Sequence, residues 1–261
     1  MAAAQEIQED HTPATVGFVE TFDAPLATDD WFLANFDIES RRFLTSWRQK
    51  QITQNPPSDD WPHGGSLTLA LEPRAPEADK PFYGAEVQRK GFLHYGRYEV
   101  VMTAAVGSGI VSSFFTYTGP HFGDPHDEID IEFLGKDTRY IWLNRFVDGE
   151  GLHTTHDDLT IPLDFNAAEE PRLYGFDWRE DAIIWYLDGE EIHRVTSDDV
   201  TIPTTPGKLM INIWVGNPGQ AGGTGPTPQN ANGTATYYCM SYRPFDDDGE
   251  GCSEFWAGIQ Q

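Results

Sequence analysis

Short segments in which apolar and polar residues alternate follow one another along most of the chain. Gly, Pro, Asp and Asn residues separate these segments, which is the pattern of β-strands joined by turns. The segments cover residues 65–71, 95–104, 109–117, 128–134, 139–146, 173–178, 182–189, 191–195, 208–216 and 234–242. Asp188-Gly189 stands between two of them and favours a tight hairpin turn. Many short strands at close spacing predict an all-β fold, a β-sandwich or jelly roll.

Helical periodicity is weak throughout. Residues 164–173 are long enough for one short helical turn, and no longer segment shows a helical pattern. The Gly- and Pro-rich residues 216–234 predict a long loop, because a strand-like segment follows them. With no internal repeat or dividing linker, we expect a loose tail over residues 1–15 and a single domain over residues 16–261.

Composition narrows the class of partner. The chain has 261 residues, of which 39% are hydrophobic, enough for a substantial core. Asp and Glu number 42 against 17 Lys and Arg, a net charge of −25 that argues against nucleic acid or an anionic membrane as partner. Such a strongly acidic composition also suits a protein from a saline habitat. No apolar run is long enough to span a membrane, and the first residues show no signal peptide.

The two cysteines, Cys239 and Cys252, lack the neighbours of a zinc site. A disulfide that closes a short acidic loop and two unpaired thiols both stay open at this stage.

The segment "EIDIEFL" carries the candidate chemistry. Alternate residues of a strand share one face, so Glu128, Asp130 and Glu132 project together while Ile129, Ile131 and Phe133 enter the core. A solvated acidic face is the plain interpretation, but three like charges in a row destabilise a strand. Three carboxylates on one face of a strand therefore indicate a functional role for this face.

Two uses fit such a row of carboxylates, a metal cage and paired acid–base catalysis. Calcium takes six to eight oxygens, usually from loops, and one rigid strand offers too few. Retaining glycoside hydrolysis needs two carboxyl groups ~5–5.5 Å apart. Glu128 and Glu132 lie roughly 13 Å apart at Cα, so their side chains must lean together over a concave sheet. Close like charges raise the pKa of one carboxyl, as a general acid requires.

Aromatic side chains on neighbouring segments could bind sugars or pack in the core. They are Phe115, Tyr117, Trp142, Phe146 and Trp214. Asn144 shares a face with Trp142 and Phe146, and an Asn is costly in a dry core, which favours a cleft on this face. The same alternation puts Arg145 on the core side, which requires a buried acidic partner or an earlier end of the strand.

These residues resemble glycoside hydrolase family 16, whose Glu-x-Asp-x-Glu motif is matched by residues 128–132. The segments 109–120, 127–138, 174–189 and 205–216 are similar to bacterial mixed-linkage β-glucanases (lichenases) and related exopolysaccharide glycanases. The resemblance runs from about Phe18 to Tyr242. It implies a β-jelly roll of two curved antiparallel sheets with a concave substrate cleft.

The resemblance also implies roles. Glu128 is the nucleophile, Glu132 the general acid/base, and Asp130 hydrogen-bonds to the nucleophile and tunes its protonation. Glu86 binds sugar hydroxyls. The remaining substrate-binding candidates are Phe115 and His126 beside the motif, Asn144 and Phe146 in the cleft, and Tyr117 and Trp214 on the donor side.

The chain departs from the lichenase pattern at several positions. His126 replaces a Trp; it either packs or caps a turn, or hydrogen-bonds the sugar next to the cleaved bond. Gln88 replaces a sugar-binding Arg, and residues 216–234 replace a Trp-containing loop. Tyr238 stands where many members have the Asp of a calcium site, which disfavours a structural calcium without excluding it, and we expect no cofactor.

The expected activity is retaining hydrolysis of β-1,3/1,4-glucan or a related β-linked polysaccharide. A transglycosylase with the same carboxylates is the alternative, and a non-catalytic carbohydrate-binding jelly roll would predict a broken carboxylate set. β-1,3-Glucan and an acylated bacterial polysaccharide follow as substrates. The net charge disfavours an anionic polymer unless the cleft is locally basic, for which Lys136, Arg139 and Arg145 lie near in sequence. We expect a monomer, secreted or periplasmic because its polymer lies outside the cell.

Overall fold

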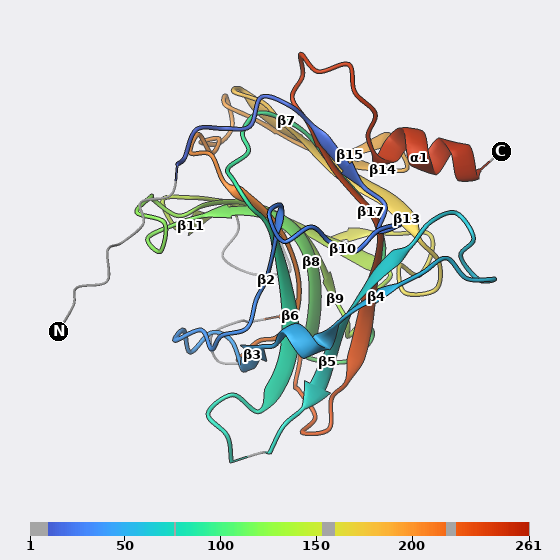
Figure 1. Cartoon of the computed structure of the whole chain (residues 1–261). Helices are drawn as coiled ribbons and strands as arrows, with labels where there is room; N and C mark the ends of the chain where they lie inside the picture. Colours follow the sequence, from blue (N-terminus) through green and yellow to red (C-terminus); the bar gives the residue numbers. More distant parts are fainter. Residues whose placement is uncertain (1–9, 76, 153–159, 218–222, 261) are drawn as a thin grey trace.

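The structure, a computed structural model, describes residues 10–75, 77–152, 160–217 and 223–260. Figure 1 shows strands that curve around a common core, with one short helix at the C-terminal end. The strands are β1 (Phe18–Glu20), β2 (Trp31–Leu33), β3 (Thr45–Trp47), β4 (Ile52–Asn55), β5 (Ser66–Pro73), β6 (Phe82–Arg89), β7 (Gly96–Thr103), β8 (Ile110–Thr118), β9 (Asp127–Leu134), β10 (Tyr140–Val147), β11 (Glu150–Gly151), β12 (Thr160–Pro162), β13 (Arg172–Trp178), β14 (Ala182–Leu187), β15 (Glu190–Thr196), β16 (Lys208–Val215) and β17 (Gly233–Arg243). The helices are η1 (Gln49–Gln51) and α1 (Cys252–Ile259).

The strands form two layers. The inner sheet runs β2–β6–β16–β8–β9–β10, with β11 and β12 on the outer edge of β10. The outer sheet runs β4–β5–β17–β7–β13–β14–β15, and β1 also pairs with β17. Within the described residues, β3 and β6 make the single parallel strand pair. The predicted all-β jelly roll of two antiparallel sheets is confirmed.

The core between the layers explains the alternation seen in the sequence. Ile129, Ile131 and Phe133 of β9 are fully buried in it, as predicted. Trp185 of β14 is buried in the same cluster and donates its indole N–H to the backbone carbonyl of Asp130 at 3.1 Å. Tyr237 of β17 donates its hydroxyl to the carbonyl of Ser113 at 2.9 Å. The outer sheet thus holds the backbone of the inner strands from behind.

Each of the ten alternating segments coincides with a strand. The hairpin at Asp188-Gly189 is also confirmed: it joins β14 to β15, and both residues have positive φ, 49° and 85°. The expected helical turn in residues 164–173 is wrong in form, because turns occupy residues 167–169 and β13 begins at Arg172.

The helix α1 was not predicted, because eight residues give too little periodicity to recognise. Two devices hold it: the Gly251 N–H donates to the Glu254 carboxylate at 2.7 Å, and a disulfide joins Cys252 to Cys239 of β17. The structure thereby decides between the two states left open for the cysteines.

Part of the predicted N-terminal tail lies against the domain. Residues 1–9 are outside the described residues. The N–H of Ala14 donates to the carbonyl of Phe92 at 2.9 Å, and the ring of His11 stacks on Phe92 with centroids 4.1 Å apart. His11 also pairs with Asp124 at 3.0 Å. None of the described helices has the length and apolar character needed to cross a bilayer.

Candidate active site

Strand β9 places its three carboxylates on the open face of the inner sheet. The register sets Glu128 between Tyr117 of β8 and Phe146 of β10. The same register sets Asp130 between Phe115 and Asn144, and Glu132 between Ser113 and Trp142. Because strand neighbours on one face are in contact range, each carboxylate has its own pair of partners.

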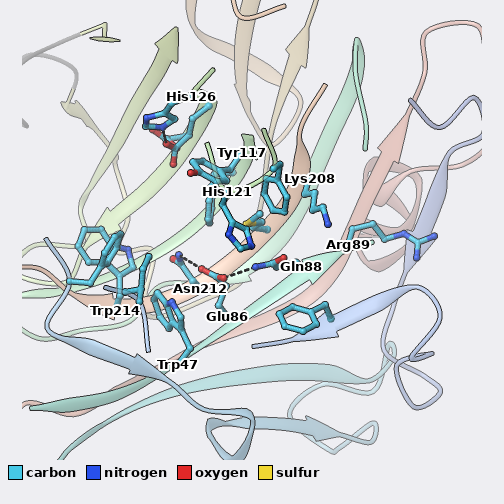
Figure 2. A pocket seen from close by; sticks show the side chains of 18 of the residues that line it. Trp47, Glu86, Gln88, Arg89, Tyr117, His121, His126, Lys208, Asn212 and Trp214 are labelled. Atoms are coloured by element: carbon cyan, nitrogen blue, oxygen red, sulfur yellow. Dashed lines mark hydrogen bonds and ion pairs between the residues drawn. The ribbon is translucent and has the colours of Figure 1, made fainter. Parts of the chain in front are cut away.

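A cleft of about 860 Å³ opens over this face (Figure 2). All three β9 carboxylates line it, together with Glu86 of β6. The volume of the cleft lies within the range typical of ligand-binding clefts.

Glu132 is built to hold a proton. Its carboxyl is 9% exposed and accepts a hydrogen bond from the Ser113 hydroxyl at 3.0 Å. Burial and the charge of Glu128 raise the pKa of Glu132 to about 7, although the Ser113 hydrogen bond and Arg42 oppose the rise. A carboxyl that stays protonated near neutral pH can act as a general acid.

Asp130, between the two glutamates, has an environment that favours its protonated form. Burial raises its pKa well above the ordinary value, with further contributions from the charges of Glu128 and Glu132 and from hydrogen bonding with Glu128. The protonated form of Asp130 can donate a hydrogen bond to the carboxylate of Glu128, the arrangement expected of a nucleophile and its neighbour.

His126 lies directly beside Glu128, with Nε2 of the ring 2.5 Å from Oε2 of the carboxylate. The imidazole also stacks on Phe146, with centroids 5.0 Å apart and planes at 13°. Since the carboxylate can only accept, a proton on Nε2 is donated to it. The contact with the predicted nucleophile adds a function to the two interpretations given from the sequence.

Glu86 completes the row of polar side chains across the sheet. Its carboxylate accepts from Gln88 Nε2 at 2.8 Å and from Asn212 Nδ2 at 3.4 Å, the contacts dashed in Figure 2. Burial raises the pKa of Glu86. Asn212 pairs across β16 and β8 with Ser113, so the row continues from Glu86 to Glu132.

The structure brings nearly all of the predicted binding residues together. Those that line the cleft are Glu86, Phe115, Tyr117, His126, Trp142, Phe146 and Trp214. Asn144 is the exception: its side chain is buried and its Oδ1 accepts from the backbone N–H groups of Arg145 and Leu152, at 2.8 and 3.1 Å. It shapes the chain after β10 instead of lining the cleft.

Of the two alternatives proposed for Arg145 from the sequence, an earlier end of the strand is wrong. Burial lowers the pKa of Arg145, and the charges of the buried Asp127 and of Glu150 oppose that lowering. The strand continues to Val147, and the guanidinium donates to the backbone carbonyl of Glu150 at 2.9 Å, not to a side-chain carboxylate. Among the described residues that line the cleft, Lys136, Arg139 and Arg145 are absent. The cations found there are Arg42, Arg89, Lys90 and Lys208.

Other cleft residues were missed because they lie outside the motif. Trp47 of β3 and Phe43, which precedes β3, line the cleft. Phe43 packs edge-on against Trp214 with centroids 4.8 Å apart. In Figure 2, Trp214 and Lys208 lie on opposite sides of Glu86. An aromatic-rich "RRFLTSW" segment was the available signal, but only the fold places it over the inner sheet.

Tyr238, at the position where the resemblance places calcium in other members, lies in an aromatic contact. The Tyr238 ring packs on Trp61 with centroids 4.3 Å apart and supplies no carboxylate. In the part of the chain that the structure describes, no group of three or more His, Cys, Asp or Glu side chains is arranged to hold a metal ion.

Comparisons with known proteins agree with this geometry. The sequence model of glycosyl hydrolases family 16 matches residues 40–239. The chain is 51% identical over 186 residues to a beta-glucanase of Bacillus licheniformis, covering 71% of this chain and 70% of the relative. It is 39% identical over 210 residues to a beta-glucanase of Brevibacillus brevis, covering 80% and 74%.

A solved structure has the same fold. It is a prokaryotic beta-1,3-1,4-glucanase (lichenase) derived from a mouse hindgut metagenome, which superposes with a TM-score of 0.76 at 37% identity. The alignment covers 88% of this chain and all of that one. The resemblance drawn from the carboxylate motif is confirmed. The chain is a glycoside hydrolase and belongs to family 16 of the glycosyl hydrolases.

Proposed function

We propose that the chain is a retaining endo-β-glycanase that hydrolyses β-1,3/1,4-glucan, or a related β-linked polysaccharide, by double displacement. One observation carries the proposal. Two glutamates on one face of β9 meet the same cleft, and burial beside Glu128 raises the pKa of Glu132 to about 7. One carboxyl is thereby a proton donor and the other a nucleophile.

In the first step, a carboxylate oxygen of Glu128 forms a bond to the anomeric carbon. The glycosidic C–O bond breaks, and Glu132 gives its proton to the departing oxygen. In the second step, Glu132 takes a proton from water as the water oxygen attacks the anomeric carbon, which releases Glu128. The His126 hydrogen bond orients Glu128 and stabilises the carboxylate that leaves in this step.

Sugar rings would be held by aromatic faces and by polar groups of the cleft. Tyr117, Phe115 and Trp214 supply the faces, and Glu86 accepts from hydroxyls. Oδ1 of Asn212 is buried without a hydrogen-bond partner among the described residues, which leaves it available to accept from a sugar hydroxyl. Such buried polar atoms set ligand orientation.

The relatives support glucan hydrolysis over transglycosylation, because at 39% and 51% identity they are named beta-glucanase. The lichenase structure supports mixed-linkage glucan as the first substrate to test. We place the protein outside the cytoplasm, secreted or periplasmic, which the disulfide supports. The reaction as written requires no cofactor, and the monomeric state stays a prediction.

The test uses barley mixed-linkage glucan, laminarin, xyloglucan and succinoglycan, with product sizes followed by chromatography. Short oligosaccharides from mixed-linkage glucan are expected, and addition of a short acceptor should not lengthen them. Acceptor-lengthened products would instead assign a transglycosylase. Glu128→Gln keeps the side-chain shape and should abolish hydrolysis with the fold intact; activity within about tenfold of the parent would refute the nucleophile.

A further inference from the structure

Eight of the twelve arginines of this acidic protein form an ion pair with a carboxylate. Those with a carboxylate partner are Arg48, Arg89, Arg97, Arg139, Arg172, Arg179, Arg194 and Arg243. Among the described residues, the guanidinium groups of Arg41 and Arg42 have neither a hydrogen bond nor an ion pair, and of these two only Arg42 lines the cleft. In a chain with 42 acidic residues against 17 basic ones, a cleft guanidinium without a carboxylate partner needs an explanation.

The backbone around Arg42 is fixed. The carbonyl of Arg42 accepts from the N–H of Asn217 at 2.8 Å, and its own N–H donates to the Ser40 hydroxyl at 3.2 Å. The next residue, Phe43, makes a β-bridge to Gly216 and packs against Trp214. Arg42 therefore stands on a segment that is tied to the end of β16 and to an aromatic wall of the cleft.

The position of Arg42 along the cleft follows from the register. Asn212 pairs across the strands with Ser113, and Ser113 pairs with Glu132. Trp214 lies two residues beyond Asn212 on the same strand. The Arg42 end is thus beyond Glu132 and away from His126 and Glu128. The charge of Arg42 acts on Asp130 and Glu132, lowering the pKa of both against the larger effect of burial.

We propose that Arg42, beside the aromatic wall of Phe43 and Trp214, forms a subsite for a carboxylate carried by the β-glycan, as on a uronic acid or a dicarboxylic acyl substituent. The inference deepens the proposed function and rests on it. A guanidinium offers paired N–H donors that match a carboxylate, and such charge-assisted bonds are about twice as strong as neutral ones.

The net charge of the protein also bears on how a carboxylate could bind in the cleft. At a net charge of −25 an anionic glycan is repelled by the protein surface, so a bound carboxylate needs a local cation. The competing interpretation is that Arg42 only offsets the charge of the catalytic carboxylates. These two roles differ in one respect, because a counter-ion would favour no particular substrate.

The experiment measures binding without turnover. In a Glu128→Gln background, affinity electrophoresis compares retention by barley mixed-linkage glucan with retention by the same glucan after partial oxidation of C6 to carboxylates. Arg42→Gln is the test variant, Arg42→Lys keeps the charge without the planar fork, and Arg41→Gln is the matched control. Arg41 is exposed, does not line the cleft and makes the same change in net charge.

Arg42→Gln should lose about tenfold or more of its affinity for the oxidised glucan, with little change for the neutral one. Arg42→Lys should lose part of the preference, and Arg41→Gln none. Equal losses on both glucans, or equal effects of Arg41→Gln and Arg42→Gln, would overturn the subsite. Hydrolysis of neutral barley glucan by the unmodified protein tests the proposed function separately, since neutral glucan needs no carboxylate site.

Discussion

His126 Nε2 lies 2.5 Å from Oε2 of Glu128, and the imidazole stacks on Phe146. The stacking on Phe146 therefore fixes the imidazole, and the imidazole in turn positions the carboxylate of Glu128, the proposed nucleophile.

Replacing His126 tests this contact. His126→Phe keeps an aromatic ring on Phe146 but removes the donor, and kcat/KM should fall roughly 10- to 150-fold, the worth of a hydrogen bond to a charged group. His126→Gln, which keeps a donor without the ring, should lose less. Equal rates for the Phe variant and the parent on barley glucan would show that the contact does not support catalysis.

The pH dependence of the reaction should report Glu132. The general acid must be protonated, so kcat/KM should fall as the pH rises through about 7. The Ser113 hydroxyl lowers the pKa of Glu132, so Ser113→Ala should move this alkaline limb to higher pH. The measurement is a pH profile of both proteins, and an unchanged limb would assign it to another group.

Stability should move with pH in the opposite sense from a salt-bridged carboxylate. The folded-state pKa of Glu132 is raised from 4.5 to about 7, so folding binds a proton that the unfolded chain releases. The contribution of Glu132 to the free energy of unfolding is fully present below pH 4.5 and is lost as the pH rises through about 7. Glu132→Gln should remove the loss, adding on the order of 3 kcal/mol at pH 8 and little at pH 4.

Urea unfolding of the parent and the Glu132→Gln variant at both pH values measures this difference. The Ser113 hydroxyl can still donate to the amide oxygen of Gln, so the variant keeps that contact. If the difference in free energy of unfolding between variant and parent is the same at both pH values, the buried carboxyl is not the source of the pH dependence.

The disulfide should stabilise the protein without taking part in the reaction. Cys239 and Cys252 are 13 residues apart and tie α1 to β17, far from the β9 carboxylates along the chain. Replacing both by Ser should lower the free energy of unfolding by about 3 kcal/mol by the chain-entropy argument. Thermal melting, with activity measured well below the transition, checks both statements; lost activity in a folded variant would contradict them.

The sequence allowed the middle of the inner sheet to be predicted well, because alternation reports burial directly. Ile129 and Ile131 enter the core and Glu128 and Glu132 face the cleft, as the period of two requires. Alternation predicts which face of the sheet a side chain is on, but not its hydrogen-bond partner. Asn144 is on the cleft face, yet its carboxamide turns to the backbone of Leu152.

Long-range placement could not be predicted. Arg42 reaches the cleft because Phe43 bridges to Gly216, a contact across more than half of the chain that no local pattern records. The same holds for the Trp185 indole behind Asp130. For α1, the signal was present in Gly251 and Glu254 but too short to separate from a turn.

The most direct test of the two-carboxylate account is the anomeric configuration of the first product. Proton NMR of barley glucan hydrolysis, followed from the first minutes, distinguishes the α from the β reducing end before mutarotation mixes them. Attack by Glu128 and then by water inverts the anomeric carbon twice, so the β anomer should accumulate first. The α anomer appearing first would mean a single displacement by water, and Glu128 would not be the nucleophile.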